Sequence, residues 1–143
     1  MAVTEHGAYA AIATALSTEL NSIASAGLTA ASAAIDNTSN LDLYADFELV
    51  VAAQGTARVA GATVQLFIVV ALDGTNYGDV NATTAEVIAV FPLDAVVTAR
   101  RAVIRDVPIP PALFKLFAVN STGQTLAASA NTIKYRTHSV STV

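Results

Sequence analysis

The spacing of apolar residues changes once along this chain, after Gly27, and this change constrains the fold more than any other feature. Beyond Gly27 apolar residues recur at every second position, the period of a strand whose side chains alternate between two faces. The clearest case lies between Leu41 and Val51, where one face is apolar and the other polar. The apolar face carries Leu41, Leu43, Ala45, Phe47, Leu49 and Val51, and the polar face Asp42, Tyr44, Asp46 and Glu48. Such alternation predicts a sheet with one buried and one solvated face.

Further strand-like segments follow at regular spacing, with no helical pattern between them. They are residues 29–35 (a weak alternation closed by the turn residues 36–40), 63–72, 86–93, 100–107, 113–119 and 130–140. The segment 63–72 carries Phe67 and Val69 on its second face, so we expect it to be covered on both sides. Short strands without intervening helices predict an all-β fold, an antiparallel β-sandwich or jelly roll.

The first 27 residues show a different, helical spacing. Their apolar stripe consists of Tyr9, Ile12, Ala13, Leu16, Leu20 and Ile23. Offsets of three and four predict a short N-terminal helical arm, capped by Thr4 or starting nearer Ala8, and ended by Gly27. We therefore divide the chain into the arm, residues 1–27, and a β-sandwich domain, residues 28–143. A helix this short needs packing, so its stripe docks on its own sandwich or, as we slightly prefer, on a neighbouring subunit.

The composition is unusually poor in charge. Only 13% of the residues are charged and 54% are hydrophobic, against about 25% charged in an ordinary soluble domain. The longest apolar run, residues 66–72, is too short to span a membrane, and no signal peptide is expected at the N-terminus. We interpret the low charge as a surface covered by neighbouring subunits; an alanine-rich monomer is the alternative. The net charge of −4 argues against a nucleic-acid partner.

Candidate chemical sites are sparse. The two histidines, His6 and His138, lie near opposite ends of the chain without partners at ligand spacing, and we expect both at the surface. Asp42, Asp46 and Glu48 share a strand face, which we interpret as solvated or partner-facing rather than as a metal or acid–base site.

Two remaining motifs have a structural explanation as well as a chemical one. The segment Asp73–Asp79 resembles a calcium loop in its alternating oxygen side chains, but a hairpin turn explains it without a metal. Arg100, Arg101 and Arg105 could attract phosphate. Arg101 and Arg105 share a strand face, however, and we expect them to pair with acidic residues of a neighbouring subunit. No nucleophile, metal-binding or phosphate-loop motif appears, so the sequence predicts a non-enzyme without metal or cofactor.

Four turn-rich stretches together resemble a known class of protein. They are Ile35–Leu41 (IDNTSNL), Val70–Tyr77 (VALDGTNY), Val107–Pro111 (VPIPP) and Val119–Gln124 (VNSTGQ). With them the chain, from about Ile35 onward, resembles structural proteins of tailed-bacteriophage virions. Among these it is most similar to the jelly-roll cement, or decoration, proteins of the capsid exterior. The resemblance implies attachment across capsomer boundaries, usually as a dimer or trimer, without a cofactor.

The functional expectation is therefore a structural virion protein. It would bind the major capsid protein and further copies of itself on the capsid exterior, after synthesis in the host cytoplasm, with no nucleic-acid or membrane partner. The predicted contact residues are Tyr9, Ile12, Leu16, Leu20, Ile23, Arg101 and Arg105. The alternative is a tail or fibre appendage module that grips glycans, and a small jelly-roll enzyme ranks third.

Overall fold

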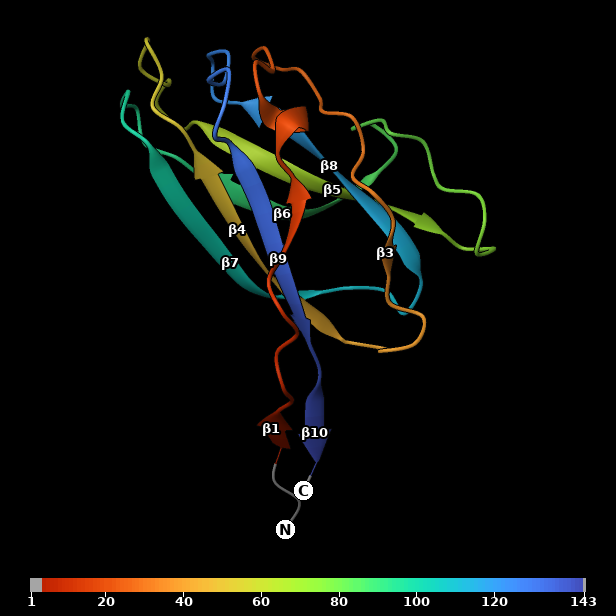
Figure 1. Cartoon of the computed structure of the whole chain (residues 1–143). Coiled ribbons are helices and arrows are strands. Elements are labelled where there is room, and N and C mark those ends of the chain that lie inside the picture. The colour runs from red at the N-terminus through yellow and green to blue at the C-terminus, as the bar shows by residue number, and fades with distance from the viewer. Residues whose placement is uncertain (1–3, 143) are drawn as a thin grey trace.

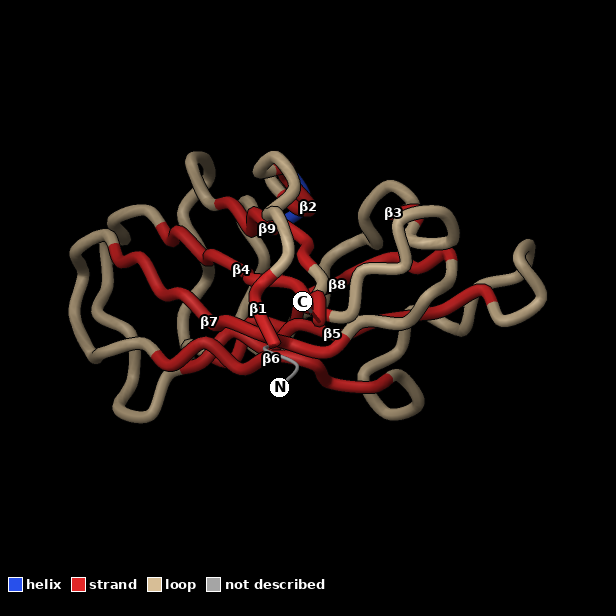
Figure 2. Tube along the Cα trace, turned by 90° about the horizontal axis from the view of Figure 1, so that it is seen from below, coloured by secondary structure: helices blue, strands red, loops and turns tan. Residues whose placement is uncertain are grey.

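The computed structural model of the chain describes residues 4–142 and is built of strands and loops (Figure 1). The strands are β1 (Thr4–His6), β2 (Ala13–Leu16), β3 (Ile35–Asp36), β4 (Tyr44–Val51), β5 (Thr63–Ala71), β6 (Glu86–Pro92), β7 (Arg100–Pro108), β8 (Leu113–Ser121), β9 (Thr132–His138) and β10 (Val140–Thr142). A single 3₁₀ turn, η1 (Thr18–Leu20), is the only helical element among the described residues (Figure 2). No helix in this part of the chain is long and apolar enough to cross a membrane.

Two four-stranded antiparallel sheets form the sandwich. One has the order β2-β9-β4-β7 and the other β3-β8-β5-β6. Successive strands from β2 to β5 alternate between the two sheets, and those from β6 to β9 do the same. Each sheet therefore interleaves strands from the two halves of the chain, which is the strand order of a jelly roll. The predicted all-β sandwich is confirmed.

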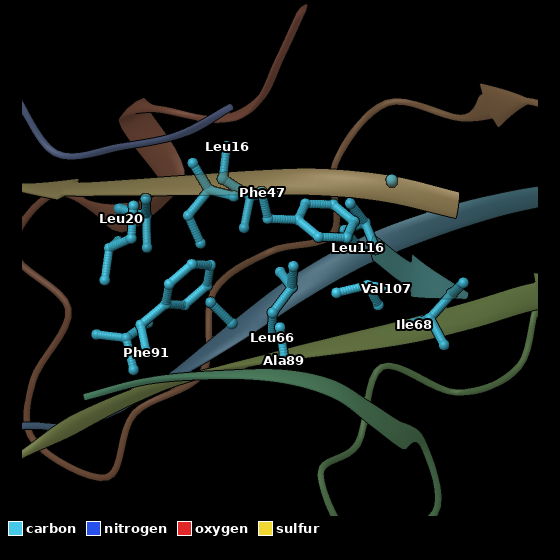
Figure 3. Close-up of a cluster of buried hydrophobic side chains, with 14 of the residues drawn as sticks. Leu16, Leu20, Phe47, Leu66, Ile68, Ala89, Phe91, Val107 and Leu116 are labelled. Carbon is cyan, nitrogen blue, oxygen red and sulfur yellow. The ribbon is translucent and has the colours of Figure 1, made fainter. Parts of the chain in front are cut away.

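The core lies between the two sheets and is filled by the inward half of each alternating strand. Its fully buried side chains include Phe47 and Leu49 of β4, Leu66 of β5, Phe91 of β6 and Leu116 of β8. Their burial follows the period-two pattern of the sequence, because successive residues of a strand face opposite sides. Figure 3 shows these aromatic and aliphatic side chains meeting between the sheets.

The prediction of an N-terminal helical arm is wrong. Ala13–Leu16 is an edge strand paired with β9, and Leu16 and Leu20 are buried in the core of the same chain (Figure 3). A β-bulge between Thr14 and Leu16, followed by η1, brings these two leucines to one side, as a helix would have done. Tertiary context overrides helix propensity here: β9 would otherwise expose an unpaired edge. Residues 13–20 thus belong to the sandwich.

Two smaller expectations also need correction. The sheet ends at Tyr44, opposite Pro108, so Leu41 and Leu43 lie beyond it and are about half exposed. Only Ile35–Asp36 of the weak segment 29–35 is a strand. The rest of that segment runs beside β8, where the hydroxyls of Thr29 and Ser32 accept hydrogen bonds from backbone N–H groups of β8. Side-chain bonds of this kind replace a regular ladder.

The two ends of the described chain form a separate ribbon. β1 pairs with β10, and the pair extends away from the sandwich (Figure 1). Where the ribbon joins the sandwich, the N–H of Gly7 donates to the carbonyl of Ser139 at 2.7 Å. A Cβ at Gly7 would meet that same oxygen at 2.8 Å, so the close approach of the two segments requires glycine.

Candidate functional site

The outer face of the sheet β2-β9-β4-β7 contains an open groove with a volume of about 370 Å³. We call this surface the groove face. It is lined by outward side chains of β4, β7 and β9 and by Ile12, just before β2. These side chains are Asp46, Glu48, Arg101, Val103, Arg105, Lys134 and Arg136. Because alternate residues of neighbouring strands share a face, the sheet itself places these charged groups side by side.

Positive charge is concentrated on the groove face. Four of the chain's seven Lys and Arg residues line it, against two carboxylates, although the whole chain has a net charge of −4. Arg105 is exposed, and its side chain forms no ion pair within residues 4–142. The local balance therefore favours an acidic partner surface.

One ion pair of the groove face is rigid. The Nε and Nη2 atoms of Arg136 donate to one oxygen of Asp46 at 3.0 and 2.9 Å, and the backbone N–H of Asp106 donates to the other at 3.0 Å. Burial raises the pKa of Asp46, but these donors outweigh it and hold that pKa below its ordinary value. The expectation that Asp46 is solvated or partner-facing is wrong, because the residue is only 6% exposed.

The second ion pair is exposed. Arg101 donates to Glu48 at 3.1 Å. Arg101 therefore pairs with a carboxylate of the adjacent strand of its own chain, and its pairing with a neighbouring subunit stays a prediction. Asp42 does not join this group: it lies before β4, where its backbone N–H donates to Asn37.

The structure separates the predicted contact residues into two groups. Arg101, Arg105 and Ile12 line the groove, and the Tyr9 ring lies 3.9 Å from the guanidinium carbon of Arg136. Ile12 is 68% exposed. The remaining three lie elsewhere: Leu16 and Leu20 are in the core, and Ile23 is half-buried in a loop where its carbonyl accepts from Asn120 and Leu126.

The two histidines meet at the end of the groove face next to the terminal ribbon. His138 is fully buried, which corrects the expectation of a surface residue, and its ring centroid lies 5.7 Å from that of His6. The His138 Nε2 atom lies 3.0 Å from a carboxylate oxygen of Asp106. Tyr9 and Tyr44 pack against the same ring, with centroids 4.7 and 5.7 Å away. No local pattern in the sequence indicated this group, because its members come from four strands and the segment after β1.

Two polar features have structural explanations. Arg58 is 2% exposed, and its guanidinium donates to the carbonyls of Asp94 and Thr98 and to the side chain of Gln54, which ties two loops together. Asp73 accepts hydrogen bonds from the N–H groups of Thr75 and Asn76 and from the Asn76 amide, which lower its pKa to about 2. The Asp73 carboxylate therefore caps a turn, as the hairpin interpretation predicts.

No family model matches the chain, and no curated protein sequence matches it. Solved structures with a similar fold include a chain of infectious bursal disease virus, Gx strain (17% identity, TM-score 0.45, covering 97% of this chain and 33% of that one). Tailspike protein 4 of bacteriophage CBA120 gives 11% identity and a TM-score of 0.37 over 100% of this chain and 19% of that one. A chain of Desmodium yellow mottle tymovirus gives 11% identity and a TM-score of 0.37, covering 99% of this chain and 87% of that one.

Chains from virus structures are thus among the proteins similar in fold to this one. The chain spans a third or less of the first two of these proteins. A jelly roll supports many unrelated functions, so the function has to be argued from the surface of this molecule.

Proposed function

We propose that this protein is a structural virion component that binds the outer capsid surface of a tailed bacteriophage. In this role it reinforces contacts between capsid subunits, and the groove face makes the contact. The observation that carries the proposal is the gathering of four cationic side chains and exposed apolar groups on one sheet face of an acidic, charge-poor chain.

The chemistry of the groove face suits a protein partner. Val103 is 55% exposed between Arg101 and Arg105, and Ile12 borders the same groove. An apolar centre flanked by arginines is typical of protein interfaces, where Arg is enriched. The partner surface on the major capsid protein should then present carboxylates around an apolar centre.

Self-association into a dimer or trimer is part of the proposal and rests on the low charge of the chain. Stable contacts bury about 800 Å² per partner. We place the protein on the capsid exterior after synthesis in the host cytoplasm, with no nucleic-acid, membrane or cofactor requirement.

The test is cosedimentation of the purified protein with tailless heads of the encoding phage. The double variant R101E/R105E reverses two exposed charges of the groove face, and K115E reverses one charge on the outer face of the opposite sheet. We expect R101E/R105E to weaken binding at least about tenfold, equivalent to about 1.4 kcal/mol, and K115E to bind like the wild type. Circular dichroism checks that all three proteins are folded.

Three outcomes would contradict the proposal. If R101E/R105E and K115E bind heads equally well, the groove face is not the surface that contacts the capsid. Copurification of the protein with tails or fibres and not with heads would favour the appendage module, and glycan arrays would then test the sugar-binding alternative. Loss of head binding after nuclease treatment would instead point to a nucleic-acid contact.

A further inference from the structure

Three ligand-type side chains converge where the terminal ribbon meets the sandwich. His6 comes from β1, Asp106 from β7 and His138 from the end of β9, and one potential ligand atom of each lies within 4.8 Å of the others. His6 and His138 are the only histidines of the chain. Their meeting depends on the pairing of β1 with β10, which places His6 opposite Val140.

We propose that His6, Asp106 and His138 bind a divalent transition-metal ion, such as zinc, with the fourth coordination position open. Two imidazoles and a carboxylate form a nitrogen-rich donor set that suits zinc and similar ions, whereas calcium and magnesium prefer oxygen ligands alone. This inference departs from the sequence-based expectation of no metal, and it is independent of the proposed capsid contact.

His138 provides the fixed point of the site. Its ring is fully buried, and Nδ1 has no hydrogen-bond partner within the described residues, although Nε2 faces Asp106. A buried nitrogen left without a partner costs about 1–3 kcal/mol, so its retention calls for an explanation. Coordination through Nε2, the nitrogen beside Asp106, leaves Nδ1 as it is, so the proposed site rests on the convergence of the three ligands.

Asp106 is held in place by its backbone. It adopts a φ of 56°, in the left-handed region, where β7 pairs irregularly with β4. Its N–H donates to Asp46, whose carboxylate also binds Arg136. Irregular strand pairing of this kind commonly redirects a side chain. The Asp46 carboxylate also offsets the positive charge of Arg136, which would otherwise oppose a cation nearby.

The spacing requires only small adjustments, since the ligand atoms lie within 4.8 Å of one another and His138 Nε2 lies 3.0 Å from Asp106. Zinc binds nitrogen and oxygen at about 2.0–2.2 Å, so ligand atoms around it lie roughly 3.5 Å apart. His6 and Asp106 are exposed and can rotate inward, while His138 is held by the surrounding rings. Binding would fasten β1, and with it the β1–β10 ribbon, to the sheet β2-β9-β4-β7.

The test uses the full chain, purified without a histidine tag and treated with chelator. Zinc is then added in calorimetric titration and in thermal unfolding, with calcium as the comparison ion. We expect one zinc ion per chain and a rise of several degrees in Tm with zinc, and no rise with calcium. H6Q and D106N should each weaken zinc binding at least about tenfold, while D79N, which changes an exposed aspartate elsewhere, should bind like the wild type.

Hydrogen exchange of the β1–β10 ribbon gives a second measurement. Zinc should slow exchange in the ribbon of the wild type and have no effect in H6Q. The site is overturned if zinc leaves the Tm of the wild type unchanged, or if H6Q and D106N bind zinc as well as D79N does. A Tm that depends on pH but not on zinc would assign the cluster to proton binding alone.

Discussion

The outer faces of the two sheets differ in what covers them. On β3-β8-β5-β6, the side chains of Phe67, Val69 and Phe117 form a second buried apolar cluster, packed against Tyr77 and Ala85 of the loop between β5 and β6. On β2-β9-β4-β7, the outward side chains are mainly charged, and an open groove runs between them.

The difference shows what an apolar pattern on both faces of a strand can establish. Phe67 and Val69 indicated a second cover for β5, and the cover is confirmed; it is supplied by the chain's own loop rather than by a neighbour. Such a strand therefore gives no support for self-association. The face that remains available to a partner is the charged one, where burial within the chain is incomplete.

The largest loss of stability should come from truncating a buried side chain on the outer face of β3-β8-β5-β6. We expect Phe117→Ala to lower the free energy of unfolding by about 3–5 kcal/mol, because Phe117 is fully buried and stacks on Phe67 with centroids 5.0 Å apart. Urea unfolding measures the loss. Val103→Ala on the groove face is the control and should cost less than about 0.5 kcal/mol. Similar losses for the two variants would contradict the conclusion that one outer face is buried and the other is open.

The next effect concerns the one buried carboxylate of the groove face. Asp46→Asn should cost about 1–3 kcal/mol at pH 7, because it weakens the bonds to Arg136 and to the Asp106 N–H. The pKa of Asp46 is lowered in the folded protein, so its stabilising effect is present above the unfolded value near 3.9.

That contribution is lost as the pH falls through the lowered pKa of Asp46. The gap in stability between wild type and D46N should therefore close in strongly acidic solution. Urea unfolding at a series of pH values measures it, with D79N as the control. A gap that stays constant down to pH 2 would show that Asp46 acts through its shape and not its charge.

A smaller effect is expected where the covering loop meets its sheet. The ammonium of Lys115 lies 4.4 Å from the centre of the Tyr77 ring. Lys115→Met keeps most of the side-chain length and removes the charge, and should lower stability by about 0.5–1 kcal/mol. The comparison is with K115M in a Tyr77→Leu background, where the loss should vanish. An equal loss in both backgrounds would mean that the contact between the Lys115 ammonium and the Tyr77 ring does not contribute to stability.

The smallest effect should come from the exposed ion pair of the groove face. A double-mutant cycle of Arg101→Ala and Glu48→Ala should give a coupling energy below about 1 kcal/mol, because Arg101 is well exposed and water screens the pair. A much larger coupling would assign this pair to the stability of the sandwich. It would then weaken the argument that Arg101 is free to serve a partner.

The period-two alternation predicted the central strands well. In β4 and β5 the apolar positions of the alternation are buried, because both strands lie in the middle of their sheets, and the buried Asp46 is the exception on the polar face. Arg101 and Arg105 line the same groove, as the alternation predicted, although β7 is an edge strand. The alternation could not show where a sheet ends: Leu41 and Leu43 continue the pattern past the last paired residue, Tyr44.

The remaining errors arise where distant segments decide the structure. Leu16 and Leu20 have helical spacing, but the unpaired edge of β9 determines their conformation. His6 and His138 have no local partner, and only the pairing of the two chain ends brings them together. Single-sequence patterns report short-range periodicity, and neither feature is short-range.

The pairing of the chain's two ends also sets the order of events during synthesis. Thr4 lies opposite Thr142, and β2 finds its only partner strand in β9. During synthesis β1 and β2 must wait for β9 and β10 before they can pair, while one edge of β4 stays open. Contacts this distant in sequence form slowly, and partly folded chains with open edges tend to aggregate. We therefore expect the sandwich to close only after β9 has left the ribosome, so the incomplete nascent chain is the form most exposed to aggregation.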